Sequence, residues 1–506
     1  MSIMAADRPA ERPWWLAPAI TYAAVVIVFV AWSPANRSQF PLDDAWIHRV
    51  YARSLAWAKG FAYNDGAQEA GCTSPLWAIL SAPVQWLEPG FGTAAVVWAV
   101  KVLGIALGAL SVAAVYRLGH KLCCAAWPAA LAASLFACEP VLVFSALSGM
   151  EVVLVVCLWL WLITSIHAQQ WRLAAVLLGA LPVARPEAAL LAALAIAGLA
   201  IQRRPGLVAL LAPWNVTWCV LPTALWVAFC VLATGHPLPT TYYVKASGDL
   251  SLHALAALRV LVQHGWAQSI VLPVIGGGAL AAWCWRNRGD ALAVVLLALG
   301  SVIYVPAVVT TRSFLPLGYY WTRWTDPGVL GFVAAAMLGI ALGAHTLAGT
   351  SQLAPRVRRA AGATLAIAVL AALPRLAASI AERAERLGSD GRVIERMNVE
   401  PGRWIAAHTP ATAVIGVNDA GALRYFGGRR TIDLIGLNAA DVAFQRVPIA
   451  AIEQRVDWLA VYPLLFRLHP AFARFARVRW FSIPREEYTI CDCPGPTRMV
   501  IARRAE

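Results

Sequence analysis

Apolar runs recur along the first three quarters of this 506-residue chain, and their length decides what it can fold into. A run of about 20 apolar residues crosses the hydrocarbon core of a bilayer as one helix. The chain is 60% hydrophobic and only 13% charged, whereas soluble domains carry about 25% charged residues. Its 23 tryptophans suit membrane interfaces, where indole rings accumulate. The sequence therefore predicts a polytopic α-helical membrane protein embedded in a lipid bilayer.

The positive charge is distributed as membrane topology requires. The net charge is +14, but the basic residues fall in short loops between apolar runs. This is the positive-inside pattern, so it does not indicate nucleic-acid binding. Reading the runs and loops together predicts about 11 transmembrane helices, beginning with a retained signal-anchor helix over roughly residues 14–33. The remaining ranges that we assign are roughly 93–116, 122–144, 172–184, 187–202, 211–234 and 361–377.

Two domains are expected. Residues 1–384 would form the transmembrane domain, including a first outside loop over 34–92, and residues 385–506 a soluble α/β domain on the extracytoplasmic side. The stretch TAVIGVNDAGALRYFGGRRTIDLIGL predicts strand, turn, short helix, turn and strand, and VDWLAVYPLL and RVRWFSI predict further strands. About 120 residues can form a core of their own.

The cysteine and histidine patterns give little support to a metal cofactor. The histidines are scattered, and the pair Cys491 and Cys493 lacks a second pair at zinc-site spacing. A disulfide among Cys72, Cys491 and Cys493 is left open. Phosphate-binding glycine-rich loops of soluble nucleotide enzymes are also missing from the sequence. We therefore expect no cofactor and no divalent metal.

Paired acids and arginines follow the first apolar run. Asp43 and Asp44 come just after Pro41, where they could favour the start of a helix through its dipole. They could also serve as a general base, because two adjacent carboxylates beside a low-dielectric wall resist joint ionisation. Arg49 and Arg53 are spaced i and i+4, on one helical face, and could hold a phosphate or pair with lipid head groups.

Further charges lie at the ends of apolar runs. Glu151, in LSGME, could stabilise a helix start or face a cavity. Arg185 and Glu187, in ARPE, separate two short apolar runs. A charge inside the bilayer costs about 2.5–3.5 kcal/mol, so this pair should line or border a polar cavity, unless it is a purely structural ion pair.

Two outside segments combine aromatic and cationic residues. PLPTTYYVK contains Tyr242, Tyr243 and Lys245, and YYWTRWTDP contains Arg323. Aromatic rings and cations suit a sugar face and a phosphate. The other interpretation is an interfacial aromatic belt with a snorkelling cation.

Four motifs in order give the chain a resemblance to a known superfamily. They are the DDAWIHRVYARSLAWAKGFAYNDGAQEAGCTSPLW loop, SGME, RPE and GHPLPTTYYVK. The chain resembles the GT-C integral-membrane glycosyltransferases, most of all the cell-wall arabinofuranosyltransferases and related bacterial proteins. Protein O-mannosyltransferases and lipid A aminoarabinose transferases are more distant. The resemblance runs along most of the chain and includes NDAGALRYFGGRRTIDLIGL in the tail.

The resemblance implies an activity and roles for the singled-out residues. A GT-C enzyme moves a sugar from a polyprenyl-phosphate donor to an extracytoplasmic glycan, lipid or protein acceptor, usually with inversion. By position, Asp43 matches the catalytic acid, with Asp44 as its neighbour, and Glu151 matches the second acidic position. Arg185, Lys245 and Arg323 would bind the donor phosphate, with Tyr242 and Tyr243 near the sugar. A bacterial inner-membrane location follows.

This chain departs from the family pattern at two places. Relatives often have Pro-Asn-Thr where it has Pro239-Thr240-Thr241, and Arg-Tyr where it has Arg323-Trp324. These changes leave the sugar open, with arabinofuranose as one candidate. The rival classes are a transporter or flippase for lipid-linked sugars, which should carry charges within mid-helix and show repeats, and a non-catalytic scaffold.

Overall fold

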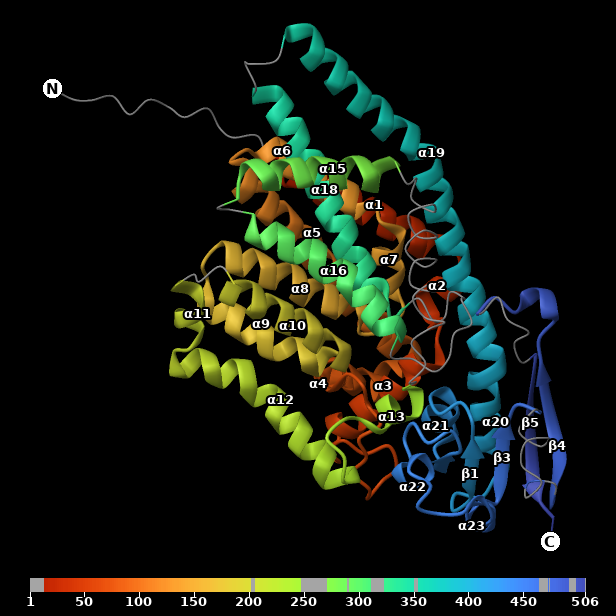
Figure 1. Ribbon diagram of the computed structural model, residues 1–506. Helices are drawn as coiled ribbons and strands as arrows, with labels where there is room; N and C mark the ends of the chain where they lie inside the picture. Colours follow the sequence, from red (N-terminus) through yellow and green to blue (C-terminus); the bar gives the residue numbers. More distant parts are fainter. Residues whose placement is uncertain are drawn as a thin grey trace.

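The computed structural model describes residues 13–201, 205–246, 271–288, 291–310, 323–349, 354–463, 472, 474–490 and 497–505. A bundle of helices makes up most of the molecule, and a small sheet domain lies at one end of it (Figure 1). Among the described residues, five helices are long and apolar enough to cross a membrane, or seven if each of two bent helix pairs is one span. The chain is thus a multi-pass membrane protein, and the count of 11 stays a prediction.

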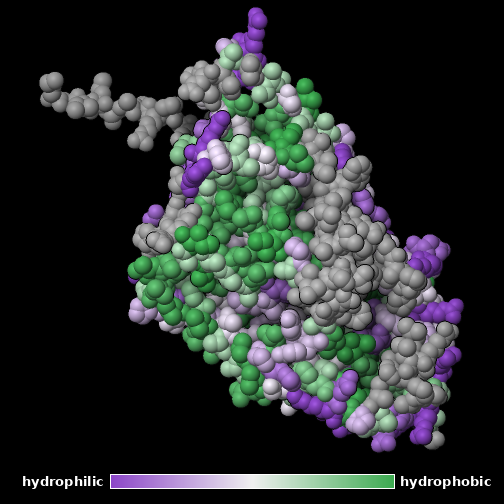
Figure 2. Space-filling model, viewed as in Figure 1, coloured by the Kyte–Doolittle hydropathy of each residue, from purple (hydrophilic) through white to green (hydrophobic). Residues whose placement is uncertain are grey.

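The helices of the bundle match the apolar runs with one correction: the run predicted as one helix over 122–144 forms two helices, Ala126–Ala137 and Pro140–Leu147, bent by 59°. Their hydrophobic residues also cover the surface around the middle of the bundle, where Figure 2 shows apolar side chains, while hydrophilic ones gather towards the sheet domain. The helices are α1 (Leu16–Trp32), α5 (Glu88–Cys123), α6 (Ala126–Ala137), α7 (Pro140–Leu147), α8 (Val152–His167), α9 (Trp171–Ala184), α10 (Ala189–Ile201), α11 (Pro205–Leu210), α12 (Pro213–Thr234), α15 (Val271–Arg286), α16 (Leu292–Thr310), α18 (Asp326–Gly349) and α19 (Pro355–Ile394).

Short helices gather where the bundle meets the sheet domain. The segment α2–α3 turns away from α1 by 110°. Leu42 has extended backbone and precedes two acidic residues in the first turn of α3, where carboxylates interact favourably with the helix dipole. The short elements of the bundle are α2 (Pro34–Ser38), α3 (Asp43–Ala56), α4 (Pro75–Ser81), η1 (Ala82–Leu87), η2 (Pro186–Ala188) and α13 (Thr240–Lys245).

The sheet domain confirms the strands expected from the sequence and adds one more. Its five strands have the order β2-β1-β3-β5-β4; β1 is parallel to β2 and β3, and β5 is antiparallel to β3 and β4. The added strand is β5. The strands are β1 (Val414–Val417), β2 (Arg430–Asp433), β3 (Trp458–Val461), β4 (Phe475–Ser482) and β5 (Arg498–Arg504). The other elements are η3 (Glu395–Val399), α20 (Glu400–His408), α21 (Ala422–Gly427), α22 (Ala440–Ala443), α23 (Ile449–Arg455) and η5 (Arg485–Glu487).

The two parts of the molecule are joined without a loop linker. Helix α19 continues through the predicted boundary at 384/385 and ends only at Ile394. Figure 1 shows it running along the bundle to the sheet domain. The first loop adds a second connection, because the Asn64 side chain donates to the Thr431 carbonyl (2.8 Å) and accepts from the Thr431 N–H (2.9 Å). The sheet domain is therefore fixed against the loop that carries the paired aspartates.

Candidate active site

A small polar cavity lies between α3, the start of α8, the α9–η2 turn and α13. Its volume is ≈ 30 Å³, which is room for one or two water molecules. Among the described lining residues, cations outnumber carboxylates by three to two, which suits a negatively charged ligand. The charged and imidazole side chains of the lining are Asp44, His48, Glu151, Arg185, Lys245 and Arg323.

Asp44 lies between two cations in this cavity. Its Oδ2 accepts a hydrogen bond from Nη2 of Arg323 and lies 3.5 Å from Nζ of Lys245. Both cations also approach the Trp324 ring, the guanidinium carbon at 4.9 Å and the ammonium at 5.7 Å from its centroid. Burial lowers the pKa of Lys245, against the attraction of Asp44. Residues from three distant segments thus place one carboxylate beside two positive charges.

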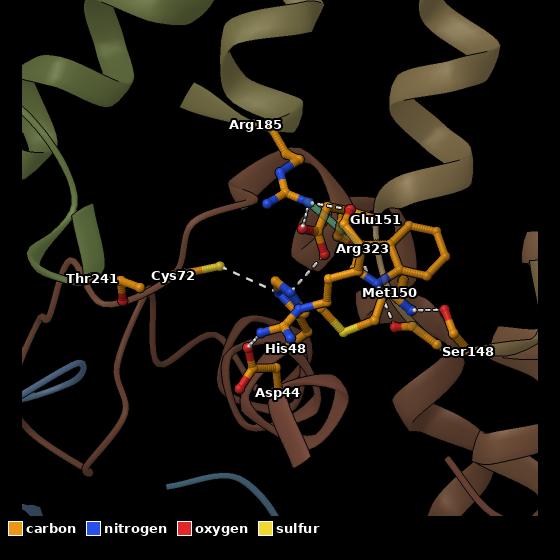
Figure 3. A network of polar contacts seen from close by, with 12 residues as sticks. Asp44, His48, Cys72, Ser148, Met150, Glu151, Arg185, Thr241 and Arg323 are labelled. Atoms are coloured by element: carbon orange, nitrogen blue, oxygen red, sulfur yellow. Dashed lines mark hydrogen bonds and ion pairs between the residues drawn. The ribbon is translucent and has the colours of Figure 1, made fainter. Parts of the chain in front are cut away.

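A second group of charges forms the opposite wall (Figure 3). Glu151 has a basic side chain on each side: Nη1 of Arg185 lies 3.2 Å from its Oε1, and Nε2 of His48 lies 3.0 Å from its Oε2. Arg185 also donates to the main-chain carbonyl of Arg323 (3.3 Å). This contact links the Glu151 group to the Asp44 group. A Cβ at Gly149 would come within 2.6 Å of Phe40, so glycine is needed where this wall begins.

Asp43 faces away from the cavity, into the contact with the sheet domain. Its carboxylate accepts hydrogen bonds from the N–H groups of Gly421 and Ala422, both at 2.8 Å, and the residue is only 5% exposed. The two segments lie so close that a Cβ on Gly421 would be 2.1 Å from the Asp43 carbonyl. Burial, followed by repulsion from Asp419, raises the pKa of Asp43, and the two N–H groups oppose that rise. Asp43 therefore holds the sheet domain on α3.

Arg49 and Arg53 are not brought together into one site. Arg49 is fully buried and donates to the Ser81 hydroxyl (2.6 Å). Arg53 donates to the Tyr425 carbonyl (2.9 Å), and its guanidinium carbon lies 4.0 Å from the Tyr425 ring centroid. Neither lines the cavity. The expected shared phosphate site is corrected on geometric grounds: Arg49 packs among α4 and η1, whereas Arg53 lies at the sheet domain.

Three further residues singled out in the sequence lie beside the cavity and outside its lining. Glu187 lies behind Arg185, with its Oε2 3.4 Å from the Arg185 Nε. Tyr242 and Tyr243 pack edge to face at 5.6 Å, and Tyr243 continues into a ring contact with Phe444 of the sheet domain at 5.4 Å. In this structure the two tyrosines connect α13 to α22.

Sequence reasoning missed His48, Thr241 and Trp324 as lining residues. For His48 a signal was present, because it follows Asp44 by four residues and so shares its face of α3. The Thr241 hydroxyl donates to the Gly71 carbonyl (2.7 Å), which closes the cavity against the first loop. Trp324 was noted in the sequence only as a departure from the family pattern, and its place in the lining was not predicted.

Metal ligands do not cluster in the part of the chain that the structure describes: no three His, Cys, Asp or Glu side chains gather there as a metal site would require. Cys72 is buried, with its Sγ 3.8 Å from Nδ1 of His48. Cys491 and Cys493 lie outside the described residues.

Glu69, in the first loop, gives a test of the pH dependence of stability. Burial raises its pKa from 4.5 to about 7, so the folded chain holds this proton more tightly than the unfolded chain. The free energy of unfolding should fall as pH rises through that window. We expect Glu69→Gln to flatten this fall in a thermal unfolding series in detergent, and the exposed Glu486→Gln to leave it unchanged. An unaltered slope in Glu69→Gln would contradict the assignment.

Comparisons with known proteins add to this geometry. Residues 391–497 match a family described as a domain of unknown function (DUF8728). No curated protein sequence matches the chain. Solved structures do resemble it over nearly its whole length. ArnT from Cupriavidus metallidurans bound to undecaprenyl phosphate aligns with a TM-score of 0.61 at 13% identity, covering 97% of this chain and 98% of that one.

Two more solved structures agree. ArnT in the apo state gives a TM-score of 0.59 at 15% identity, covering 96% of this chain and 97% of the other. The Archaeoglobus fulgidus oligosaccharyltransferase in the apo form gives 0.56 at 11% identity, covering 89% of this chain and 70% of that protein. At such low identities the likeness concerns the fold alone.

Proposed function

The chain has the GT-C fold, and from this premise we propose that it is a membrane glycosyltransferase that uses a polyprenyl-phosphate sugar as donor. The acceptor would be a glycan, lipid or protein on the extracytoplasmic side of a bacterial inner membrane. Arabinofuranose is the sugar that we would test first. The observation that supports this proposal best is the position of Asp44 between Lys245 and Arg323 in the cavity.

The chemistry of this arrangement suits transfer from a lipid phosphate. The acceptor hydroxyl is a poor nucleophile until a base takes its proton, and Asp44 would do so. The acceptor oxygen then bonds to the anomeric carbon while the bond from that carbon to the phosphate oxygen breaks. The phosphate leaves with the electron pair, and Lys245 and Arg323 would stabilise its charge. Attack from the side opposite the phosphate inverts the anomeric centre.

Arg185, Glu151 and His48 would shape the site behind these groups. Glu151 neutralises Arg185 at 3.2 Å, and Arg185 binds the Arg323 carbonyl at 3.3 Å, so this wall fixes the backbone that carries one phosphate ligand. A cavity of ≈ 30 Å³ is too small for a sugar. Donor binding would therefore require this space to widen.

A transfer assay tests the proposal. Purified wild type and Asp44→Asn are incubated in membranes with radiolabelled polyprenyl-phosphate sugars, arabinofuranose first, and a crude envelope extract as acceptor. We expect label to move from lipid to the extract with wild type alone. Equal transfer by both proteins would show that Asp44 is not the general base. Label that stays on lipid with every sugar and both proteins would oppose the transferase assignment.

Lys245→Ala should weaken donor binding more than it slows turnover. Losing one hydrogen bond between charged groups costs about 1.5–3 kcal/mol, so we expect the donor KM to rise by about 10–100-fold. The exposed Lys121→Ala, at the end of α5, is the matched control and should behave as wild type. The measurement is initial rate against donor concentration. An unchanged donor KM together with an unchanged kcat would argue against a phosphate-binding role for Lys245.

A further inference from the structure

A second cationic cavity lies on the outside of α3, at the opposite end of that helix from Asp43. Its volume is ≈ 260 Å³, and the wall combines the end of α3, the first loop and α21 of the sheet domain. Three cations, Arg53, Lys59 and Arg424, line it together with a single carboxylate, Asp65. Two positive charges are therefore in excess among the described lining residues. The transferase proposal does not use this cavity.

The charge of the three cations is only partly compensated: Asp65 pairs with Lys59, and Glu69, outside the lining, attracts Arg424. Arg53 and Arg424 donate to backbone carbonyls, those of Tyr425 and Tyr63, both at 2.9 Å, which fix the guanidinium groups without neutralising them. Lys59 pairs with Asp65 at 3.0 Å on the exposed side. The pKa of Asp65 is lowered chiefly by the hydrogen bond from Lys59, with smaller effects of Arg424 and Arg53.

The other lining groups suit a phosphate ester. Ser54 lines the cavity, is 8% exposed, and its hydroxyl has no hydrogen-bond partner among the described residues. Trp57 lies at the rim and is 50% exposed. An arginine pair offers the planar donor groups that phosphate oxygens prefer.

The cavity also lies at the level expected for lipid head groups. The Trp86 indole N–H donates to the Ala56 carbonyl (3.1 Å), at the end of α3 next to the cavity. Trp86 is 61% exposed and lies just before the long apolar helix α5. Exposed tryptophans at the end of a span are typical of the membrane–water interface. A ligand in the cavity would therefore be within reach of the bilayer surface.

We propose that this cavity, lined by Arg53, Lys59 and Arg424, binds a phosphate group at the membrane surface, carried by an anionic lipid head group or by a soluble phosphate. The site joins the transmembrane part to the sheet domain, because Arg53 belongs to α3 and Arg424 to α21. A bound phosphate would hold both arginines at once. It would therefore stabilise the contact between the two parts.

Amine labelling of Lys59 tests the proposal on the whole protein and needs no turnover, so the result is independent of the transferase assignment. The chain is placed in phosphatidylcholine nanodiscs and labelled with an amine reagent, with peptides quantified by mass spectrometry. One arm adds inorganic phosphate, and the other replaces part of the lipid by phosphatidylglycerol. Lys121, which is also exposed, reports general effects in the same molecule.

We expect labelling of Lys59 relative to Lys121 to slow about tenfold when the ligand is about tenfold above its Kd. Protection by phosphatidylglycerol alone would identify a lipid head group, and protection by inorganic phosphate a soluble ligand. Arg424→Gln, and independently Arg53→Gln, should abolish it, whereas Arg403→Gln, outside the cavity on α20, should not. Labelling that changes in neither arm, or protection that survives both arginine variants, would overturn the proposal.

Discussion

Replacing Asp44 by asparagine is expected to lower the rate of sugar transfer by about 10²–10⁴-fold, the usual contribution of a general base. The amide keeps the size of the side chain but cannot take the acceptor proton. Donor binding should persist. The Asp44 carboxylate lies 3.5 Å from Lys245 and accepts a hydrogen bond from Arg323, so its removal leaves both cations available to the donor phosphate. The measurement is single-turnover transfer, with binding of the polyprenyl-phosphate donor determined separately.

Asp43→Asn is the matched control, because it changes the neighbouring residue in the same way. Its carboxylate binds the N–H groups of Gly421 and Ala422 at 2.8 Å, and an amide can accept only one of these two hydrogen bonds. We expect a loss of thermal stability with the chemical step largely retained in the folded fraction. If Asp44→Asn transfers sugar at the wild-type rate while Asp43→Asn is well folded but inactive, Asp43 is the general base.

Arg185→Met should be the most destabilising single change in the site. It leaves Glu151 with its side chain only 2% exposed and without its guanidinium partner. Breaking a buried ion pair from one side costs about 3–5 kcal/mol, because the remaining charge stays buried. The measurement is thermal unfolding of the full chain in detergent, supported by the fraction that elutes as a monodisperse peak.

Two further variants separate this cost from a general effect of losing an arginine. Arg392→Met breaks an exposed pair with Glu385 at 3.3 Å, with the two side chains 53% and 58% exposed, so it should cost at most about 1 kcal/mol. Adding Glu151→Gln to Arg185→Met removes the stranded charge and should restore part of the lost stability. If Arg185→Met and Arg392→Met behave alike, the buried pair is not the structural element that we describe.

The local elements followed closely from the sequence. The run over 172–184 became α9 (Trp171–Ala184), and the run over 211–234 became α12 (Pro213–Thr234), because a helix in lipid satisfies its own backbone within one segment. The strand–helix–strand reading of the tail became β1, α21 and β2 for similar local reasons. The strand β5 was not predicted, because its apolar centre is short and has arginines at both ends.

Local sequence patterns do not determine which distant residue each charged side chain contacts. Asp43 and Asp44 are adjacent and chemically identical, yet neighbouring residues of a helix point about 100° apart, so only one of them can face the cavity. Which one does so depends on Gly421, 378 residues further along the chain, which docks on the other.

The sequence by itself determined that this is a membrane-spanning helical protein with a small α/β domain and charged groups near the ends of its spans. Those properties depend on the length of apolar runs and on backbone hydrogen bonding, which are local. The tertiary structure decided that Asp44, Lys245 and Arg323 share a cavity, whereas Arg49 and Arg53 bind different partners, Ser81 and Tyr425. The contacts of Asp44 with Lys245 and Arg323 join segments about 200 and 280 residues apart, and only tertiary packing brings these segments together.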